Sequence, residues 1–169
     1  MKKPVIIAIV GPSGSGKTVM AEYLERELGI PTIVSYTTRP MRENEVDGVG
    51  HYFVTIDAMP HVYEMLAYTE FGGYYYWANK SQVSEVCSYI IDELGLMRLY
   101  SKFHNNYDIV PIQIVRDQDI LTQTIDSERL QRDQDRVALE DLTYRVVIKN
   151  NGTLDEFYKT ISRTIKSIL

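Results

Sequence analysis

The chain has 169 residues, 44% of them hydrophobic and 24% charged, and its net charge is −5. This length and composition are typical of one globular domain with a sizeable core. The negative charge disfavours broad electrostatic binding to nucleic acid or to an anionic membrane. The single cysteine, Cys87, excludes an internal disulfide. No segment approaches the ~18 consecutive apolar residues that cross a bilayer, so we expect a cytoplasmic protein.

The N-terminal part of the chain predicts a strand, a glycine-rich loop and a helix, in that order. Val5 to Val10 is a continuous apolar run, which is typical of a strand buried on both faces of a parallel sheet. Residues 17–28 carry apolar side chains at helical spacing, and Gly29 favours a helix end there. Strand, loop and helix in this order open a βαβ unit.

The remaining elements alternate between strands and helices. We expect a short helix over residues 57–68, a hairpin over 69–78 that turns at Gly72-Gly73, and a last helix from Leu154 to Ile168 with Thr153 as its N-cap. Further strands are predicted at residues 32–36, 51–55, 89–92, 110–115 and 144–150. The alternation predicts an α/β fold with a doubly wound parallel sheet. Together with a phosphate-loop sequence, "GPSGSGKT" after the first strand, it predicts the P-loop NTPase type.

We expect residues 1–169 to form a single domain with three parts. Its core would be residues 1–33 and 80–169. An insertion of short strands at about 34–79 would bind the molecule that accepts a phosphoryl group, the acceptor. A short lid is expected at about 118–140.

The segment "GPSGSGKT", Gly11 to Thr18, matches the phosphate-loop pattern G-x-x-x-x-G-K-[ST] in full. Its glycines allow turns that point backbone N–H groups at phosphate oxygens, and the following helix N-terminus adds partial positive charge. The lysine can reach the β- and γ-phosphates, and the threonine hydroxyl can ligate Mg²⁺. The pattern therefore predicts a site for ATP with Mg²⁺, formed by Gly11, Ser13, Gly14, Ser15, Gly16, Lys17 and Thr18.

Residues 35–54, "SYTTRPMRENEVDGVGHYFV", are rich in arginine, hydroxyl and carboxylate side chains. Arg39 and Arg42 lie on either side of Pro40, which stiffens the loop. Two guanidinium groups held in this way suit a second dianion, such as a monophosphate. Ser35, Thr37 and Thr38 can supply hydroxyls, and Glu45 and Asp47 could orient the arginines or meet a base. Composition alone also fits a solvated charged loop.

Several segments resemble guanylate kinases. "SYTTRPMRENEVDG" followed by "YFV" is similar to that family's acceptor-binding segment, S-x-T-T-R-x-P-R-x-G-E-x-x-G-x-x-Y-x-F. "FGGYYYWA" resembles its F-x-G-N-Y-Y-G-T, "IIDELG" its L-D-I-D-x-Q-G, and "VVIKNNGTLDEF" its V-I-x-N-D-D-L-D-x-A. The resemblance extends over the whole chain. It implies a divergent guanylate kinase that converts GMP and ATP to GDP and ADP.

The resemblance also implies roles for individual residues. Arg39 and Arg42 would clamp the monophosphate together with Tyr76, and Ser35 would face the guanine. Asp92 would lie near the metal or the acceptor ribose, so that Thr18 and Asp92 are the metal candidates, and Asn150 would lie near the adenine of ATP. The expected acceptor-binding residues are Ser35, Arg39, Arg42, Glu45, His51, Glu70, Tyr76 and Asp92.

Some positions depart from the family pattern. His51 stands where the family has a phosphate-binding tyrosine. With Tyr76 aligned to the family tyrosine, Trp77 and Ala78 replace a Gly-Thr pair, and Ala67 replaces the glutamate that reads guanine. Glu70 could substitute for that glutamate if the hairpin register differs. The resemblance thus implies that phosphate recognition is retained and that guanine recognition is weakened.

The segment "SERLQRDQDRV" places Arg129, Arg132 and Arg136 on one face of a predicted helix. Arginines of a closing lid can stabilise the charge shared by donor and acceptor, although a solvated helix would have the same pattern. We expect Lys17, Arg39, Arg132 and Arg136 to carry catalysis by positioning and electrostatics, without a general base.

Three functions remain open from the sequence. The first is a GMP kinase, the second a kinase of a phosphorylated sugar, and the third a non-catalytic module that holds a phosphopeptide. The complete phosphate loop disfavours the third. The expected partners are ATP and GMP, with no nucleic acid and no membrane, and the chain would be a monomer or a homodimer.

Overall fold

The computed structural model describes residues 2–128 and 143–169. Its central sheet is parallel and has the strand order β2-β7-β1-β8-β9. These strands are β1 (Val5–Val10), β2 (Thr32–Ile33), β7 (Val86–Ile90), β8 (Asp108–Val115) and β9 (Val146–Lys149). The predicted α/β fold with a parallel sheet is confirmed.

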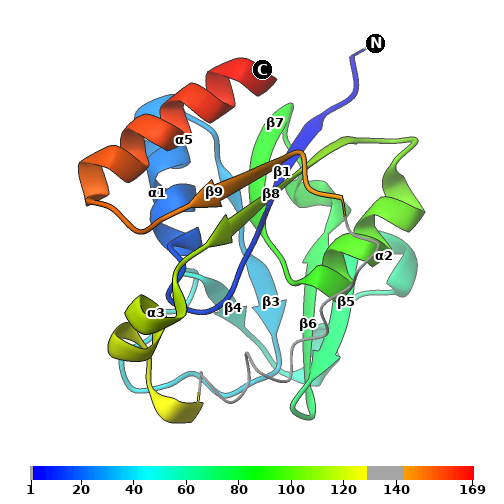
Figure 1. Ribbon diagram of the computed structural model, residues 1–169. Coiled ribbons are helices and arrows are strands. Elements are labelled where there is room, and N and C mark those ends of the chain that lie inside the picture. Colours follow the sequence, from blue (N-terminus) through cyan, green and yellow to red (C-terminus); the bar gives the residue numbers. More distant parts are fainter. Residues whose placement is uncertain (1, 129–142) are drawn as a thin grey trace.

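Helices cover both faces of this sheet (Figure 1). Helices α1 (Lys17–Leu28) and α5 (Leu154–Ile168) lie on one face, and α2 (Glu93–Phe103) lies on the other. Alternate residues of β1 enter the two cores: Ile7 packs with the α1 and α5 side, and Ile6 with the α2 side. Because both faces of β1 are buried, its apolar run has no polar alternation.

The ends of two helices follow from their capping residues, as predicted. Gly29 ends α1 in the left-handed conformation, with φ 65°. At the start of α5, the Glu156 backbone N–H donates to Thr153 Oγ1 (3.3 Å), and the Thr153 N–H donates to Glu156 Oε2 (2.7 Å). None of the helices in the described ranges is both long and apolar enough to cross a membrane.

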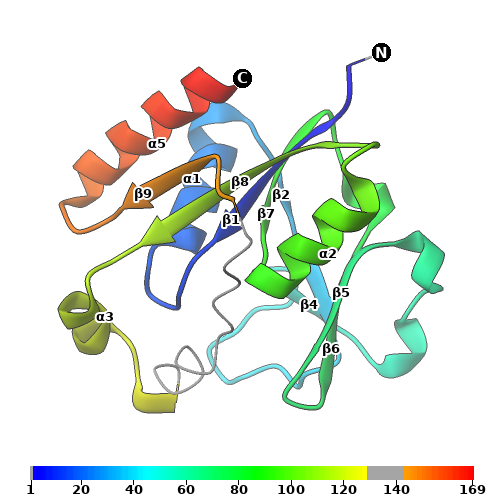
Figure 2. The ribbon, with the colours of Figure 1, turned by 45° about the vertical axis from the view of Figure 1, so that its right-hand side comes forward.

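A second, four-stranded sheet has the order β4-β3-β6-β5 and lies below α2 in Figure 2. Its strands are β3 (Ser35–Thr37), β4 (His51–Phe53), β5 (Met65–Phe71) and β6 (Tyr74–Asn79). The hairpin between β5 and β6 turns at Gly72 and Gly73, as predicted. All four strands come from residues 35–79, whereas the exact division into core, insertion and lid stays a prediction.

The structure corrects several expected elements. The helix expected over 57–68 is wrong: two single 3₁₀ turns, Ile56–Ala58 and Val62–Glu64, flank Pro60, and β5 begins at Met65. Proline restricts the residue before it and lacks an N–H, and pairing with β6 then extends the chain.

Other differences concern strand boundaries and helices that were not predicted. The strand expected at 32–36 is split between the two sheets, as β2 and β3. The strand expected at 89–92 is β7, which ends at Ile90, and Asp92 is the N-cap of α2. Helices α2 and α3 (Gln118–Thr124) were not predicted as such.

Candidate active site

The phosphate loop follows β1, the strand between β7 and β8, at the carboxyl edge of the sheet where parallel folds bind ligands. Gly16 precedes α1 with φ 110°, and a Cβ there would lie 2.6 Å from Asn150 Nδ2. At Gly14, with φ 73°, a Cβ would lie 2.7 Å from Ile125 Cγ2. The loop therefore has a backbone conformation and a closeness of packing that require glycine.

Side chains that directly follow β8 and β9 bond to this loop. Asn150 Nδ2 donates to the Ser15 carbonyl (2.8 Å), and Arg116 Nη1 donates to the Gly14 carbonyl (3.1 Å). Lys17 Nζ donates to the Pro12 carbonyl (2.8 Å), and the Ser15 side chain is fully buried. These bonds hold the loop through its carbonyl groups.

A hollow of about 350 Å³ lies beside the phosphate loop, next to the residues that follow β8 and β9. It is lined by Gly14, Gly16, Lys17, Thr18, Val19, Arg116, Asn150, Gly152, Leu154 and Phe157. Arg116 was not predicted as a site residue. It directly follows β8 at the carboxyl edge of the sheet, and this position is the signal that could have identified it.

A cleft of about 450 Å³ joins the phosphate loop to the second sheet. The predicted residues that line it are Gly11, Ser13, Lys17, Ser35, Arg39, Arg42, Glu45, His51, Tyr76 and Asp92. The structure thus brings to one cavity the phosphate loop and residues 37–50, which carry Arg39 and Arg42 and are called the arginine loop below. Glu70 is not among the lining residues; its side chain is exposed on β5.

Glu45 holds Arg39 by a bidentate ion pair. Arg39 Nη2 donates to Glu45 Oε1 (2.7 Å) and Nη1 donates to Oε2 (2.9 Å), while the Arg42 backbone N–H also donates to Oε2 (2.8 Å). The hydrogen bonds from Arg39 lower the pKa of Glu45 to about 2. The Arg39 guanidinium also lies 5.3 Å from the centre of the Phe53 ring. The cation is therefore held in place at the edge of the cleft.

Two hydroxyls of the arginine loop are used by the fold. Thr37 Oγ1 accepts from the Arg39 backbone N–H (3.1 Å), and Thr37 is fully buried. Thr38 Oγ1 accepts from the Tyr75 N–H (3.0 Å). The Thr37 bond holds the backbone at Arg39, and the Thr38 bond fastens the loop to β6, so the threonines position the arginines.

His51 and Tyr76 lie beside Arg39 in the cleft. Their rings meet edge to face, with centroids 5.7 Å apart. Burial lowers the pKa of His51, and the charge of Arg39 lowers it further. The imidazole is therefore neutral at pH 7, next to groups that suit an anion.

The candidate metal ligands lie on the two sides of the phosphate loop. Thr18 lines the hollow of about 350 Å³. Asp92 lines the cleft, and its Oδ1 accepts a hydrogen bond from the Gly95 N–H (2.6 Å). No group of three or more His, Cys, Asp or Glu in the described residues could hold a metal ion. A hydroxyl and a carboxylate still fit Mg²⁺, which is commonly held by one or two protein oxygens together with substrate phosphates.

The expected lid arginines, Arg129, Arg132 and Arg136, lie outside the described residues.

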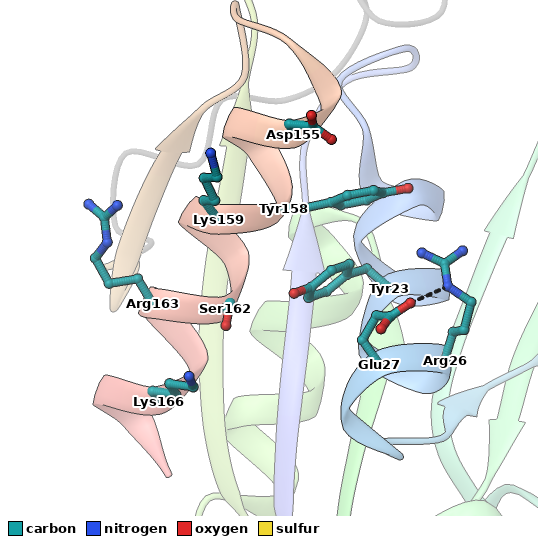
Figure 3. A pocket seen from close by; sticks show the side chains of 9 residues that line it. All are labelled: Tyr23, Arg26, Glu27, Asp155, Tyr158, Lys159, Ser162, Arg163 and Lys166. Atoms are coloured by element: carbon teal, nitrogen blue, oxygen red, sulfur yellow. Dashed lines mark hydrogen bonds and ion pairs between the residues drawn. The ribbon is translucent and has the colours of Figure 1, made fainter.

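A separate hollow of about 650 Å³ lies between α1 and α5, on the face shown in Figure 3. Tyr23 and Tyr158 stack across it with centroids 4.7 Å apart. No residue of the phosphate loop or the arginine loop lines this hollow, so it is not part of the candidate site.

The fold and the complete phosphate loop are those of a P-loop nucleotide-binding protein, and two arginines line the cleft beside the loop. The family model described as guanylate kinase matches residues 1–168. The guanylate kinase of Rhodopseudomonas palustris (strain HaA2) is 30% identical over 184 aligned positions, which cover 96% of this chain and 83% of that protein. The chain therefore belongs to the guanylate kinase family.

Other relatives match over shorter segments. The guanylate kinase of Clostridium acetobutylicum is 40% identical over 87 residues, and that of Thermosynechococcus vestitus is 43% identical over 75 residues. These alignments span 50% and 42% of this chain, and 42% and 39% of those relatives. The crystal structure of guanylate kinase from Anaplasma phagocytophilum has the same fold, with a TM-score of 0.70, 22% identity, and coverage of 99% of this chain and 87% of that one.

Proposed function

We propose that the protein catalyses ATP-dependent phosphoryl transfer to a nucleoside monophosphate, with GMP as acceptor and GDP and ADP as products. The observation that carries this proposal is that Lys17 and the arginine pair Arg39 and Arg42 line one cleft. A donor γ-phosphate at the phosphate loop and an acceptor phosphate at the arginines would then face each other. Membership of the guanylate kinase family supports the same reaction.

The reaction requires little covalent chemistry from the protein. An oxygen of the acceptor phosphate attacks the γ-phosphorus of ATP, and the bond to the β-phosphate oxygen breaks. Lys17 would stabilise the charge on the donor phosphates, and Arg39 and Arg42 would hold the acceptor phosphate. Mg²⁺, with Thr18 and Asp92 as candidate ligands, would neutralise charge on the donor phosphates. Arg132 and Arg136 of the predicted lid remain candidates for additional charge stabilisation.

A phosphorylated sugar is the second candidate acceptor. The observation that favours it is Ala67, which lines the cleft where the family resemblance expects a base-reading glutamate. Neither Ala67 nor Ser35 restricts the non-phosphate part of the acceptor to a guanine.

The test is ADP release from Mg·ATP with each nucleoside monophosphate and with several sugar phosphates. We expect turnover with GMP that is lost in Lys17→Ala, because Lys17 stabilises transferred charge. Turnover with a sugar phosphate and none with a nucleotide would replace the proposed acceptor. No turnover with any acceptor, together with retained binding of a phosphopeptide, would support the non-catalytic module.

A further inference from the structure

The further inference concerns how the acceptor cleft reads the part of the substrate beyond its phosphate, and it rests on the proposed function. Four charged side chains of the cleft belong to the phosphate loop and the arginine loop: Lys17, Arg39, Arg42 and Glu45. Farther from these two loops, the lining comes from β5, from the end of β7 and from the start of α2, and is mainly apolar or hydroxyl-bearing. This part consists of Ala67, Tyr68, Thr69, Phe71, Tyr89, Ile90, Ile91, Asp92 and Gly95.

Guanine differs from adenine in presenting two adjacent hydrogen-bond donors, N1–H and N2–H₂, to a protein side chain. A carboxylate with both oxygens available matches this pair of donors. Glu45 has both oxygens bonded, one to Arg39 and the other to Arg39 and the Arg42 N–H. Oδ1 of Asp92 accepts from Gly95 N at 2.6 Å as the N-cap of α2. Neither carboxylate offers two unengaged oxygens.

Other nearby side chains do not supply an acceptor for the N1–H and N2–H₂ donors of guanine either. Glu70 is exposed on β5 and does not line the cleft. Ser35 Oγ donates to Tyr89 Oη (3.2 Å), so these hydroxyls are paired with each other. Burial raises the pKa of Tyr89 to about 12, so its phenol stays neutral. Ala67, only 8% exposed, offers a methyl group to the cleft.

We propose that this cleft selects its acceptor by the phosphate group and scarcely discriminates between purine bases, so that GMP, IMP and AMP bind with similar affinity. A site that hydrogen-bonds a base edge rejects an analogue because buried polar groups lose their partners. No carboxylate in the described lining of the cleft has both oxygens available to the N1–H and N2–H₂ donors of guanine, so replacing GMP by AMP leaves no such carboxylate unpaired.

Equilibrium binding of GMP, IMP and AMP to the wild-type protein tests this proposal without requiring turnover. The expected dissociation constants differ by less than about tenfold, whereas a carboxylate-read base edge gives far larger ratios. A preference for GMP over AMP above about tenfold would overturn the proposal. If that preference were lost in Glu70→Ala, Glu70 would be the reader instead. Failure of all three nucleotides to bind would contradict this inference and the proposed function together.

A variant pair gives the converse test. Ala67→Glu adds a carboxylate at the cleft and should raise the GMP-to-AMP affinity ratio by about tenfold or more. Ala67→Gln has nearly the same volume without the charge, and should raise the ratio much less. Equal ratios in both variants, with AMP still bound, would show that Ala67 does not face the base. Similar wild-type affinities for GMP, IMP and AMP with no ADP release under Mg·ATP would support this inference and refute the proposed reaction.

Discussion

Arg42 is the residue whose proposed role is most specific to the acceptor. Its side chain is exposed at the cleft, and only its backbone N–H is used by Glu45. Arg42→Ala should weaken GMP binding by about 30- to 150-fold, which corresponds to about 2–3 kcal/mol for a charge-assisted pair. Titration calorimetry with GMP and with ATP would measure this effect.

ATP affinity should be almost unchanged in Arg42→Ala. Arg26→Ala is a matched control, because Arg26 lies at the α1–α5 hollow and not at the cleft. Equal losses of affinity for both nucleotides would show that this loop is not the acceptor clamp.

His51 should make stability depend on pH. Burial and Arg39 lower its pKa below the ordinary value of 6.5, so the unfolded chain takes up a proton before the folded chain does. The free energy of unfolding should therefore fall as the pH decreases from 7.5 to 5.5. His51→Tyr should reduce this fall, as measured by urea unfolding at both pH values. His104→Asn, a change at an exposed histidine, should leave it unchanged; the same fall in wild type and His51→Tyr would refute the assignment.

At the scale of elements, the phosphate loop depends on the end of β9 for its position. Asn150→Ala removes the bond to the Ser15 carbonyl and should lower ATP affinity about 5- to 15-fold, or about 1–1.5 kcal/mol. GMP affinity should change less. Thr153→Ala, which should destabilise α5 by about 1 kcal/mol without touching the loop, is the control for general destabilisation. If Thr153→Ala lowered ATP affinity equally, the effect would not come from the loop.

Local signals decided which elements could be predicted from the sequence. β1, α1 and α5 have strong patterns: a continuous apolar run, a glycine stop, and a capping box before an apolar stripe. The start of β5 was wrongly predicted as helical. Its first residues, Met65 to Ala67, follow a 3₁₀ turn and are extended because they pair with β6. α2 was missed because Asp92, its N-cap, was read as the end of a strand.

At the scale of the whole molecule, the phosphate loop and the arginine loop could be predicted as separate motifs, since each has its own spacing. Their meeting in one cleft depends on long-range pairing, which no local pattern contains. β3 pairs in parallel with β4 and antiparallel with β6, whose strands come from distant segments. The roles of Arg116 and Thr38 as supports likewise follow from tertiary contacts.

The central claim is that a phosphoryl group passes directly from ATP to an acceptor phosphate across this cleft. The most direct measurement is to follow [γ-³²P]ATP with GMP and Mg²⁺ and to separate the labelled products. We predict label in the β-phosphate of GDP for the wild type, and almost none for Lys17→Ala. Label found only in inorganic phosphate, at a rate that GMP does not change, would contradict the account.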